Sequence, residues 1–125
     1  MLTAAQEVSA LLAPMIVKSL WVVLSKAQAS SAEMEPHALE HLRYMMRLEQ
    51  EGVLWSSGPF VTPGRLVGDG LTIFNVPEET DVHRLMDEEP LTKLGLRTYN
   101  VHRWELREGK MTINLMLSRS QIEFD

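Results

Sequence analysis

The sequence predicts an α+β domain in which the elements follow the order strand, helix, strand, strand, helix, strand. Three observations support this prediction. The chain has 125 residues, which suffice for one domain with a modest core. Its 45% apolar and 23% charged residues are shares typical of a folded globular protein. Short runs rich in β-branched and aromatic residues alternate with segments of helical periodicity.

The composition also excludes several classes of site and partner. No cysteine is present, so disulfides, thiolate nucleophiles and cysteine-bound metals are excluded. A net charge of -5 disfavours nucleic-acid binding, which needs a basic surface. No apolar run approaches the ~20 residues of a membrane span, and residues 1–15 lack the basic start of a secretory signal. We therefore expect a cytoplasmic protein with neither a nucleic-acid nor a membrane partner.

The first third of the chain predicts a helix, a strand and a loop. Residues 2–12 have helical spacing of apolar side chains, with Thr3 as a cap and Pro14 as the end. Residues 16–25 (IVKSLWVVLS) are typical of a buried strand. The small and polar residues 26–33 predict a loop.

The middle of the chain predicts a long amphipathic helix and two strands. Residues 37–51 form the helix, and Gly52 caps its C-terminus. A short strand follows at residues 53–57, closed by a Gly-Pro pair. Residues 60–69 predict a loop, and the alternating residues 70–76 predict the next strand.

The last third predicts a helix and two further strands. Thr80 is expected to cap a helix that runs to about residue 88 and is ended by a Glu-Pro pair, with a connector at residues 91–95. Residues 96–108 alternate as a long strand, and residues 111–117 are a fifth strand candidate. The polar residues 118–125 are expected to be loose or swapped onto a neighbouring molecule.

This order of elements is the split βαβ plan of the ferredoxin-like fold. Right-handed crossovers place both helices on one face of an antiparallel sheet and leave the other face open. Because a large apolar face usually marks an interface, we expect a homodimer that packs sheet on sheet. The predicted organisation is a helical extension at residues 1–15, the main domain at residues 16–108, and a strand and tail at residues 109–125.

Residues 41–52 (HLRYMMRLEQEG), followed by Leu54 and a Gly-Pro pair, resemble the YCII-related family. Residues 87–91 (DEEPL) and the strand after them are similar to the family's Asp-Pro-aromatic turn and last strand. The resemblance covers about residues 16–106. It implies a dimeric α/β barrel with a ferredoxin-like protomer and an active site centred on a histidine and an aspartate.

The resemblance assigns the histidine to His41, but the acid departs from the family pattern. Glu89 stands where the family has its aspartate before the proline, Asp87 lies two residues earlier, and Leu91 replaces the aromatic residue. Residues 83–91 are also similar, more weakly, to muconolactone isomerases, which share the dimeric barrel and shift a double bond in a lactone.

The residues themselves support a role for His41. It shares a helix face with Met45 and Leu48, which places the ring against the sheet. A histidine can take up and return a proton near neutral pH, and a carboxylate within reach orients the ring. Glu89 or Asp87 is the expected partner. The alternative is a structural histidine whose hydrogen bond is simply satisfied.

Four further residues are candidates for substrate binding. Trp55 is either a core residue or a platform for substrate, and Ser57 offers a hydrogen bond to a substrate oxygen. Arg65 suits an anionic substrate. His102 either lines the same cavity as His41 or belongs to the dimer interface, because a slip of one residue exchanges the faces of a strand.

We expect neither a metal nor a cofactor. His37 and His41 are four residues apart, but a third ligand would have to come from His83, His102 or a carboxylate. No glycine-rich turn opens a helix as a phosphate site requires.

The preferred hypothesis is an isomerase or lyase that moves a proton, without a cofactor, on a small organic acid, lactone or substituted aromatic. The alternatives are a ligand-binding or interaction module without catalysis, and a cofactor-free monooxygenase, because the fold hosts all of these.

Overall fold

The computed structural model describes residues 1–61, 68–119 and 121–124. The chain divides into two compact units, of which the larger comprises Ser19–Glu105. The smaller comprises Met1–Lys18 and Leu106–Asp125. Each unit is described by itself, and the domain boundaries expected from the sequence stay a prediction.

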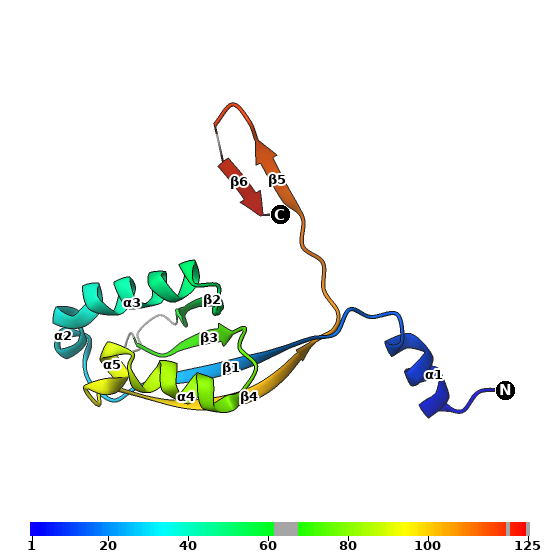
Figure 1. The fold of residues 1–125 in the computed structure, drawn as a ribbon, viewed down its shortest axis with the longest axis horizontal. Helices are drawn as coiled ribbons and strands as arrows, with labels where there is room; N and C mark the ends of the chain where they lie inside the picture. The colour runs from blue at the N-terminus through cyan, green and yellow to red at the C-terminus, as the bar shows by residue number, and fades with distance from the viewer. Residues whose placement is uncertain (62–67, 120, 125) are drawn as a thin grey trace. The chain divides into compact units, whose positions relative to one another are not determined.

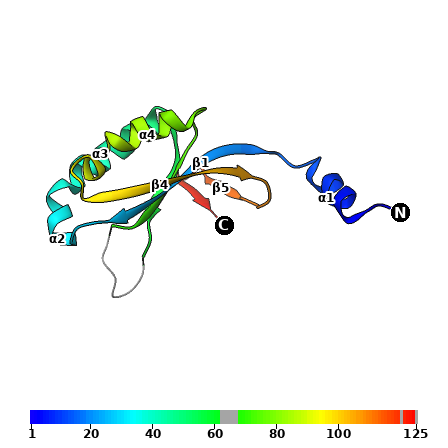
Figure 2. The same ribbon diagram turned by 90° about the horizontal axis from the view of Figure 1, so that it is seen from below.

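The larger unit holds a four-stranded sheet in the order β2-β3-β1-β4. Its strands are β1 (Lys18–Ala27), β2 (Leu54–Pro59), β3 (Gly70–Phe74) and β4 (Arg97–Leu106). β3 pairs antiparallel with both β1 and β2. The helices α3 (Ala38–Gln50) and α4 (Glu79–Asp87) lie on one face of the sheet (Figures 1 and 2). The predicted α+β, ferredoxin-like fold is thereby confirmed.

The core lies between these two helices and the sheet. Each element contributes its inward side chains to it, as period-2 strands and 3.6-period helices require. Burying each large apolar side chain contributes roughly 1.5–3 kcal/mol to folding. The buried residues of this cluster are Val23, Tyr44, Met45, Leu48, Leu54, Phe74, Val82, Leu85 and Met86. The inward placement of Met45 and Leu48 confirms the face predicted for the long helix.

A short helix begins inside the segment, residues 26–33, that the sequence predicted as a loop, and a 3-10 helix follows it. They are α2 (Ser31–Met34) and the 3-10 helix η1 (Glu35–His37). The hydroxyl of Ser30 accepts the backbone N–H of Glu33 at 3.2 Å and so caps α2. The prediction was wrong here because a local side-chain cap turns a small, polar segment into a helical turn.

Two further boundaries differ from the prediction. α4 is capped by a reciprocal pair of hydrogen bonds between Glu78 and Asp81, and Thr80 lies inside the helix. β2 continues through the Gly-Pro pair, since Pro59 stands opposite Gly70 in the pairing with β3. A proline is tolerated there because β2 lies at the edge of the sheet.

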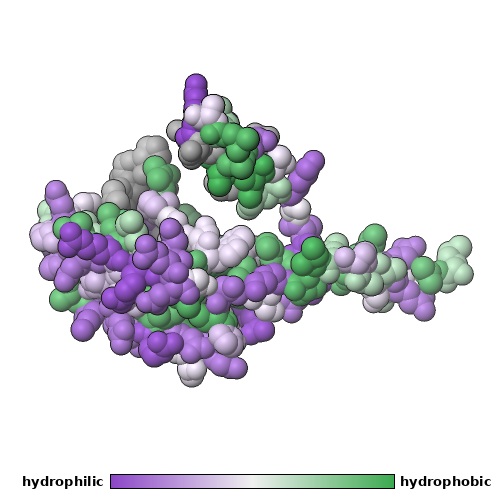
Figure 3. All heavy atoms as spheres, turned by 45° about the horizontal axis from the view of Figure 1, so that its top comes forward, coloured by the Kyte–Doolittle hydropathy of each residue, from purple (hydrophilic) through white to green (hydrophobic). Residues whose placement is uncertain are grey.

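The smaller unit contains α1 (Ala4–Leu12) and a hairpin of β5 (Ile113–Met116) and β6 (Gln121–Phe124). Thr3 and Gln6 form a capping box on α1, as the sequence predicted for Thr3. The tail was expected to be loose or swapped, but β6 pairs with β5, with Leu115 opposite Ile122. Figure 3 shows apolar side chains gathered on this hairpin. Within the described residues, no helix is both long and apolar enough to span a membrane.

Candidate active site

The Glu-Pro pair between α4 and α5 (Pro90–Lys93) carries a carboxylate into the protein interior. Pro90 disfavours a helical backbone at the preceding residue, so Glu89 is extended (φ -64°, ψ 128°) and becomes the N-cap of α5. Its carboxylate accepts the backbone N–H groups of Leu91 at 3.1 Å and Thr92 at 2.9 Å, and the Thr92 hydroxyl at 2.8 Å. These donors compensate for the complete burial of the Glu89 side chain.

His41 on α3 faces this carboxylate. Its Nδ1 lies 2.5 Å from Oε1 of Glu89, and its side chain is 21% exposed. An ionised carboxylate can only accept, so Nδ1–H of the ring donates this hydrogen bond. In the neutral ring, Nε2 is then the nitrogen with a free lone pair. The site therefore presents an imidazole of fixed orientation beside a buried anion.

Arg97, at the start of β4, adds a buried positive charge to the pair. Its side chain is 10% exposed, and Nη2 lies 3.5 Å from Oε2 of Glu89. Nη1 donates to the carbonyl oxygen of Gly68 at 3.4 Å. The buried Nε has no hydrogen-bond partner in the part of the chain that the structure describes.

These contacts fix the charge of Glu89. Burial alone raises the pKa of its carboxyl group, but the hydrogen bonds from His41, Leu91 and Thr92 and the charge of Arg97 outweigh burial and lower the pKa to about 2. The carboxylate is therefore ionised throughout the neutral range.

Asp87, the alternative acid, contacts a different residue. It is exposed and accepts a hydrogen bond from the hydroxyl of Tyr99 at 2.8 Å. Nδ1 of His83 lies 2.8 Å from the same hydroxyl oxygen. The structure thus pairs His41 with Glu89, and it places Asp87 in a surface cluster with Tyr99 and His83.

The predicted substrate-binding residues are not all brought to this pair. Trp55 is 44% exposed and meets Trp104 edge to face, with ring centroids 6.5 Å apart. Ser57 is exposed on β2, opposite Thr72 of β3. Arg65 lies outside the described residues.

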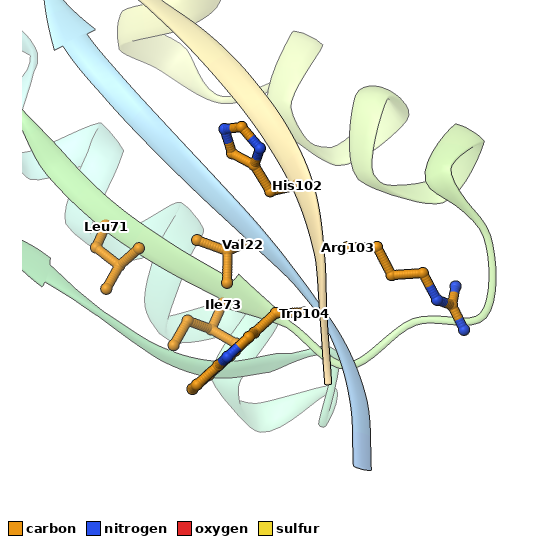
Figure 4. Close-up of a pocket in the computed structure, with 6 residues that line it drawn as sticks. All are labelled: Val22, Leu71, Ile73, His102, Arg103 and Trp104. Carbon is orange, nitrogen blue, oxygen red and sulfur yellow. The ribbon is translucent and has the colours of Figure 1, made fainter. Parts of the chain in front are cut away.

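His102 lies on the open face of the sheet. Figure 4 shows it beside a hollow of about 330 Å³, lined by Val22, Leu71, Ile73, His102, Arg103 and Trp104. The neighbouring Arg103 instead stacks on Trp21, which packs against the core, with its guanidinium carbon 5.0 Å from the ring centroid. Because successive side chains of a strand point to opposite faces, His102 faces away from the helices that carry His41.

No group of three or more potential ligands among the described histidines, aspartates and glutamates is placed to hold a metal ion. His37 ends η1 and His41 belongs to α3, where Glu89 holds the ring through Nδ1.

Sequence reasoning missed two members of the site, Thr92 and Arg97. A glutamate followed by proline and a threonine three residues later is an N-terminal capping pattern, but the sequence analysis treated the Glu-Pro pair only as the end of the preceding helix. Arg97 carries no local signal, because its burial beside Glu89 depends on tertiary packing.

Comparison with known proteins adds a family and a fold. A family model described as the YCII-related domain matches residues 19–105. No curated protein matches the chain. Among solved structures, the chain is similar to 5-chloro-2-hydroxyhydroquinone dehydrochlorinase (TftG) from Burkholderia phenoliruptrix AC1100 in complex with 2,5-dihydroxybenzoquinone, with a TM-score of 0.59 and 23% identity, over 68% of this chain and 92% of that one. At this identity the likeness shows a common fold.

Proposed function

The chain belongs to the YCII-related family, and we propose that it is a small-molecule enzyme that moves a proton without a cofactor, as an isomerase or a lyase. The observation that carries the proposal is the 2.5 Å contact between His41 Nδ1 and the fully buried Glu89 carboxylate. An imidazole held at one nitrogen by a fixed anion is a suitable general base at the other.

In the proposed step, Nε2 of His41 accepts a proton from a carbon or oxygen of the substrate, and the resulting imidazolium is stabilised by Glu89. The electron pair left on the substrate either moves a double bond, after which His41 returns the proton to another atom, or expels a leaving group. The first outcome is an isomerisation and the second an elimination. Glu89 stays ionised throughout and acts as a positioning residue, which its pKa of about 2 supports.

The proposed substrates are small organic acids, lactones or substituted aromatics. The structural neighbour is named a dehydrochlorinase of a chlorinated hydroxyhydroquinone. Loss of HCl from such a molecule includes removal of a proton, so that activity is of the kind proposed here. Trp55, Ser57, Arg65 and His102 stay predicted substrate-binding residues.

We propose a homodimer through the open sheet face as the functional form. The hollow there is lined by the apolar side chains of Val22, Leu71 and Ile73, together with His102, Arg103 and Trp104. An apolar face of this kind is commonly covered by a partner.

Deuterium exchange tests the proposed chemistry. The protein is incubated in D₂O with a panel of chlorinated hydroquinones and unsaturated lactones, and deuterium in the recovered compounds is measured by mass spectrometry. We expect exchange or turnover of at least one compound, a loss of about 10²–10⁴-fold in His41→Gln, and near-normal rates in the control His83→Gln, an exposed position on α4. Equal rates in the wild type and His41→Gln, or no reaction with any compound, would contradict the proposal. Tight binding of a compound without reaction would favour a ligand-binding module.

A further inference from the structure

We infer that Arg97 is a positioning residue that sets the charge balance of the His41–Glu89 pair by sharing the Glu89 carboxylate. On this view the guanidinium makes protonation of His41 less favourable than Glu89 alone would make it. The consequence for activity rests on the proposed function, but the effect on the ring does not.

The geometry divides the Glu89 carboxylate between an imidazole and a guanidinium. Oε1 is turned to His41, whose Nδ1 lies 2.5 Å away. Oε2 is turned to Arg97, whose Nη2 lies 3.5 Å away. Glu89 is fully buried and Arg97 is 10% exposed, so solvent screens these charges poorly.

The groups around Glu89 come from three elements packed against it. α3 contributes His41 and, one turn on, Tyr44, whose pKa is raised to about 12 by burial first and also by the charges of Glu88 and Glu89. α5 contributes the neutral donors of Thr92. β4 contributes Arg97. Of the groups that the structure describes in contact with Glu89, Arg97 is the one with a permanent positive charge.

The direction in which Arg97 affects protonation of His41 follows from the charges of the three groups. With a neutral His41 ring, Glu89 and Arg97 form a pair whose charges cancel. Protonation of His41 places a second cation beside a single buried anion, which two like charges must then share. Removal of the positive charge at Arg97 would leave Glu89 wholly available to the imidazolium. The ring would then hold its proton to higher pH and be a poorer acceptor near neutrality.

The contacts of Arg97 support action through charge rather than through structure alone. Its hydrogen bond to Gly68 is long, at 3.4 Å, and its approach to Glu89 is a single contact at 3.5 Å rather than a bidentate pair. Its buried Nε lacks a partner among the described residues. A guanidinium held only to brace the fold would be expected to satisfy its donors more fully.

Nuclear magnetic resonance of the His41 ring tests the inference without any substrate. The ring signal is assigned by its absence in His41→Gln, and its chemical shift is followed against pH in the wild type, Arg97→Gln, Arg97→Met and Arg97→Lys. The control Thr92→Val removes a neutral donor from the same carboxylate oxygen. We expect the transition to move up by about one pH unit in the two neutral variants, and to stay close to the wild type in Arg97→Lys and Thr92→Val.

Several outcomes would overturn the inference. An unmoved transition in the neutral variants would do so, and so would an equal displacement in Arg97→Lys. If both neutral variants fail to fold while Arg97→Lys folds normally, Arg97 serves the fold and the inference is wrong. Because these readouts need no turnover, a failed deuterium experiment would remove the proposed function and leave this inference standing. Where turnover is found, the acid limb of the pH profile of kcat shifts together with the His41 transition, and KM does not change.

Discussion

The hydroxyl of Tyr99 donates a hydrogen bond to Oδ1 of Asp87 at 2.8 Å and so ties β4 to the last turn of α4. The chain turns into Glu89 two residues after Asp87, so this contact braces the segment that carries the buried carboxylate. Tyr99 also lies 2.8 Å from Nδ1 of His83, one turn earlier on α4.

Tyr99→Phe removes this brace while keeping the aromatic ring. We expect a loss of about 1 kcal/mol in the free energy of unfolding, because the hydrogen bonds are partly exposed and each contributes roughly 0.5–1.5 kcal/mol. Urea unfolding followed by circular dichroism measures the change. An unchanged midpoint of unfolding would show that the contact does not contribute to stability.

Asp87→Asn keeps an acceptor for Tyr99 but removes its charge. Burial first, and then the hydrogen bond and the charge of Asp87, raise the pKa of Tyr99 to about 12. Without the charge, this pKa should fall toward the ordinary value of 10.0. Alkaline titration by ultraviolet absorbance measures it, with Tyr99→Phe identifying the signal. A midpoint as high as that of the wild type would assign the shift to burial alone.

Glu89→Gln should destabilise the fold strongly, because it leaves the buried Arg97 without its anion. Breaking a buried ion pair by removing one partner costs roughly 3–5 kcal/mol. The matched control is the adjacent, exposed Glu88→Gln, which should change stability by about 0.5 kcal/mol or less. Urea unfolding of both variants measures the change in the free energy of unfolding. Equal stabilities for the two variants would contradict the proposed importance of the buried charge.

The pH dependence of stability follows from the same carboxylate. The pKa of Glu89 is lowered from 4.5 to about 2 in the folded protein, so its contribution is fully present above pH 4.5 and is lost as pH falls toward 2. A difference of this size corresponds to about 3 kcal/mol. Urea unfolding at a series of pH values should show this loss in the wild type and a flatter dependence in Glu89→Gln. Parallel curves for the two proteins would be the contrary result.

The sequence predicted those parts of the fold that repeat a local pattern. The periodicity of α3 places Met45, Leu48 and His41 on the inward side, and the alternation of β3 separates Thr72 and Phe74 from Leu71 and Ile73. The order of these elements then leaves few ways to build the sheet. Boundaries were predicted less well where a side-chain cap decides them, as Ser30 does for α2.

The candidate site was predicted only in part, because its contacts are not local. His41 and Glu89 are 48 residues apart, and spacing alone could not choose between Glu89 and Asp87 as the partner. Pro90 determines which acid meets His41, because it makes Glu89 the N-cap of α5 with a buried side chain. Asp87 stays on the exposed side of α4. Arg97 was not predicted at all, since a charged residue at the start of a strand is normally exposed.

The open face of the sheet gives the last prediction, which concerns oligomeric state. Trp104 is 37% exposed where it lines the hollow and packs edge to face with Trp55. If two protomers meet there, Trp104→Glu buries a charge in an apolar interface and should convert the dimer to a monomer. Sedimentation velocity measures the mass. The control is Leu39→Glu, a 59% exposed position on α3, which should keep the mass of the wild type. A monomeric wild type, or a Trp104→Glu variant that stays dimeric, would show that this face is not the dimer interface.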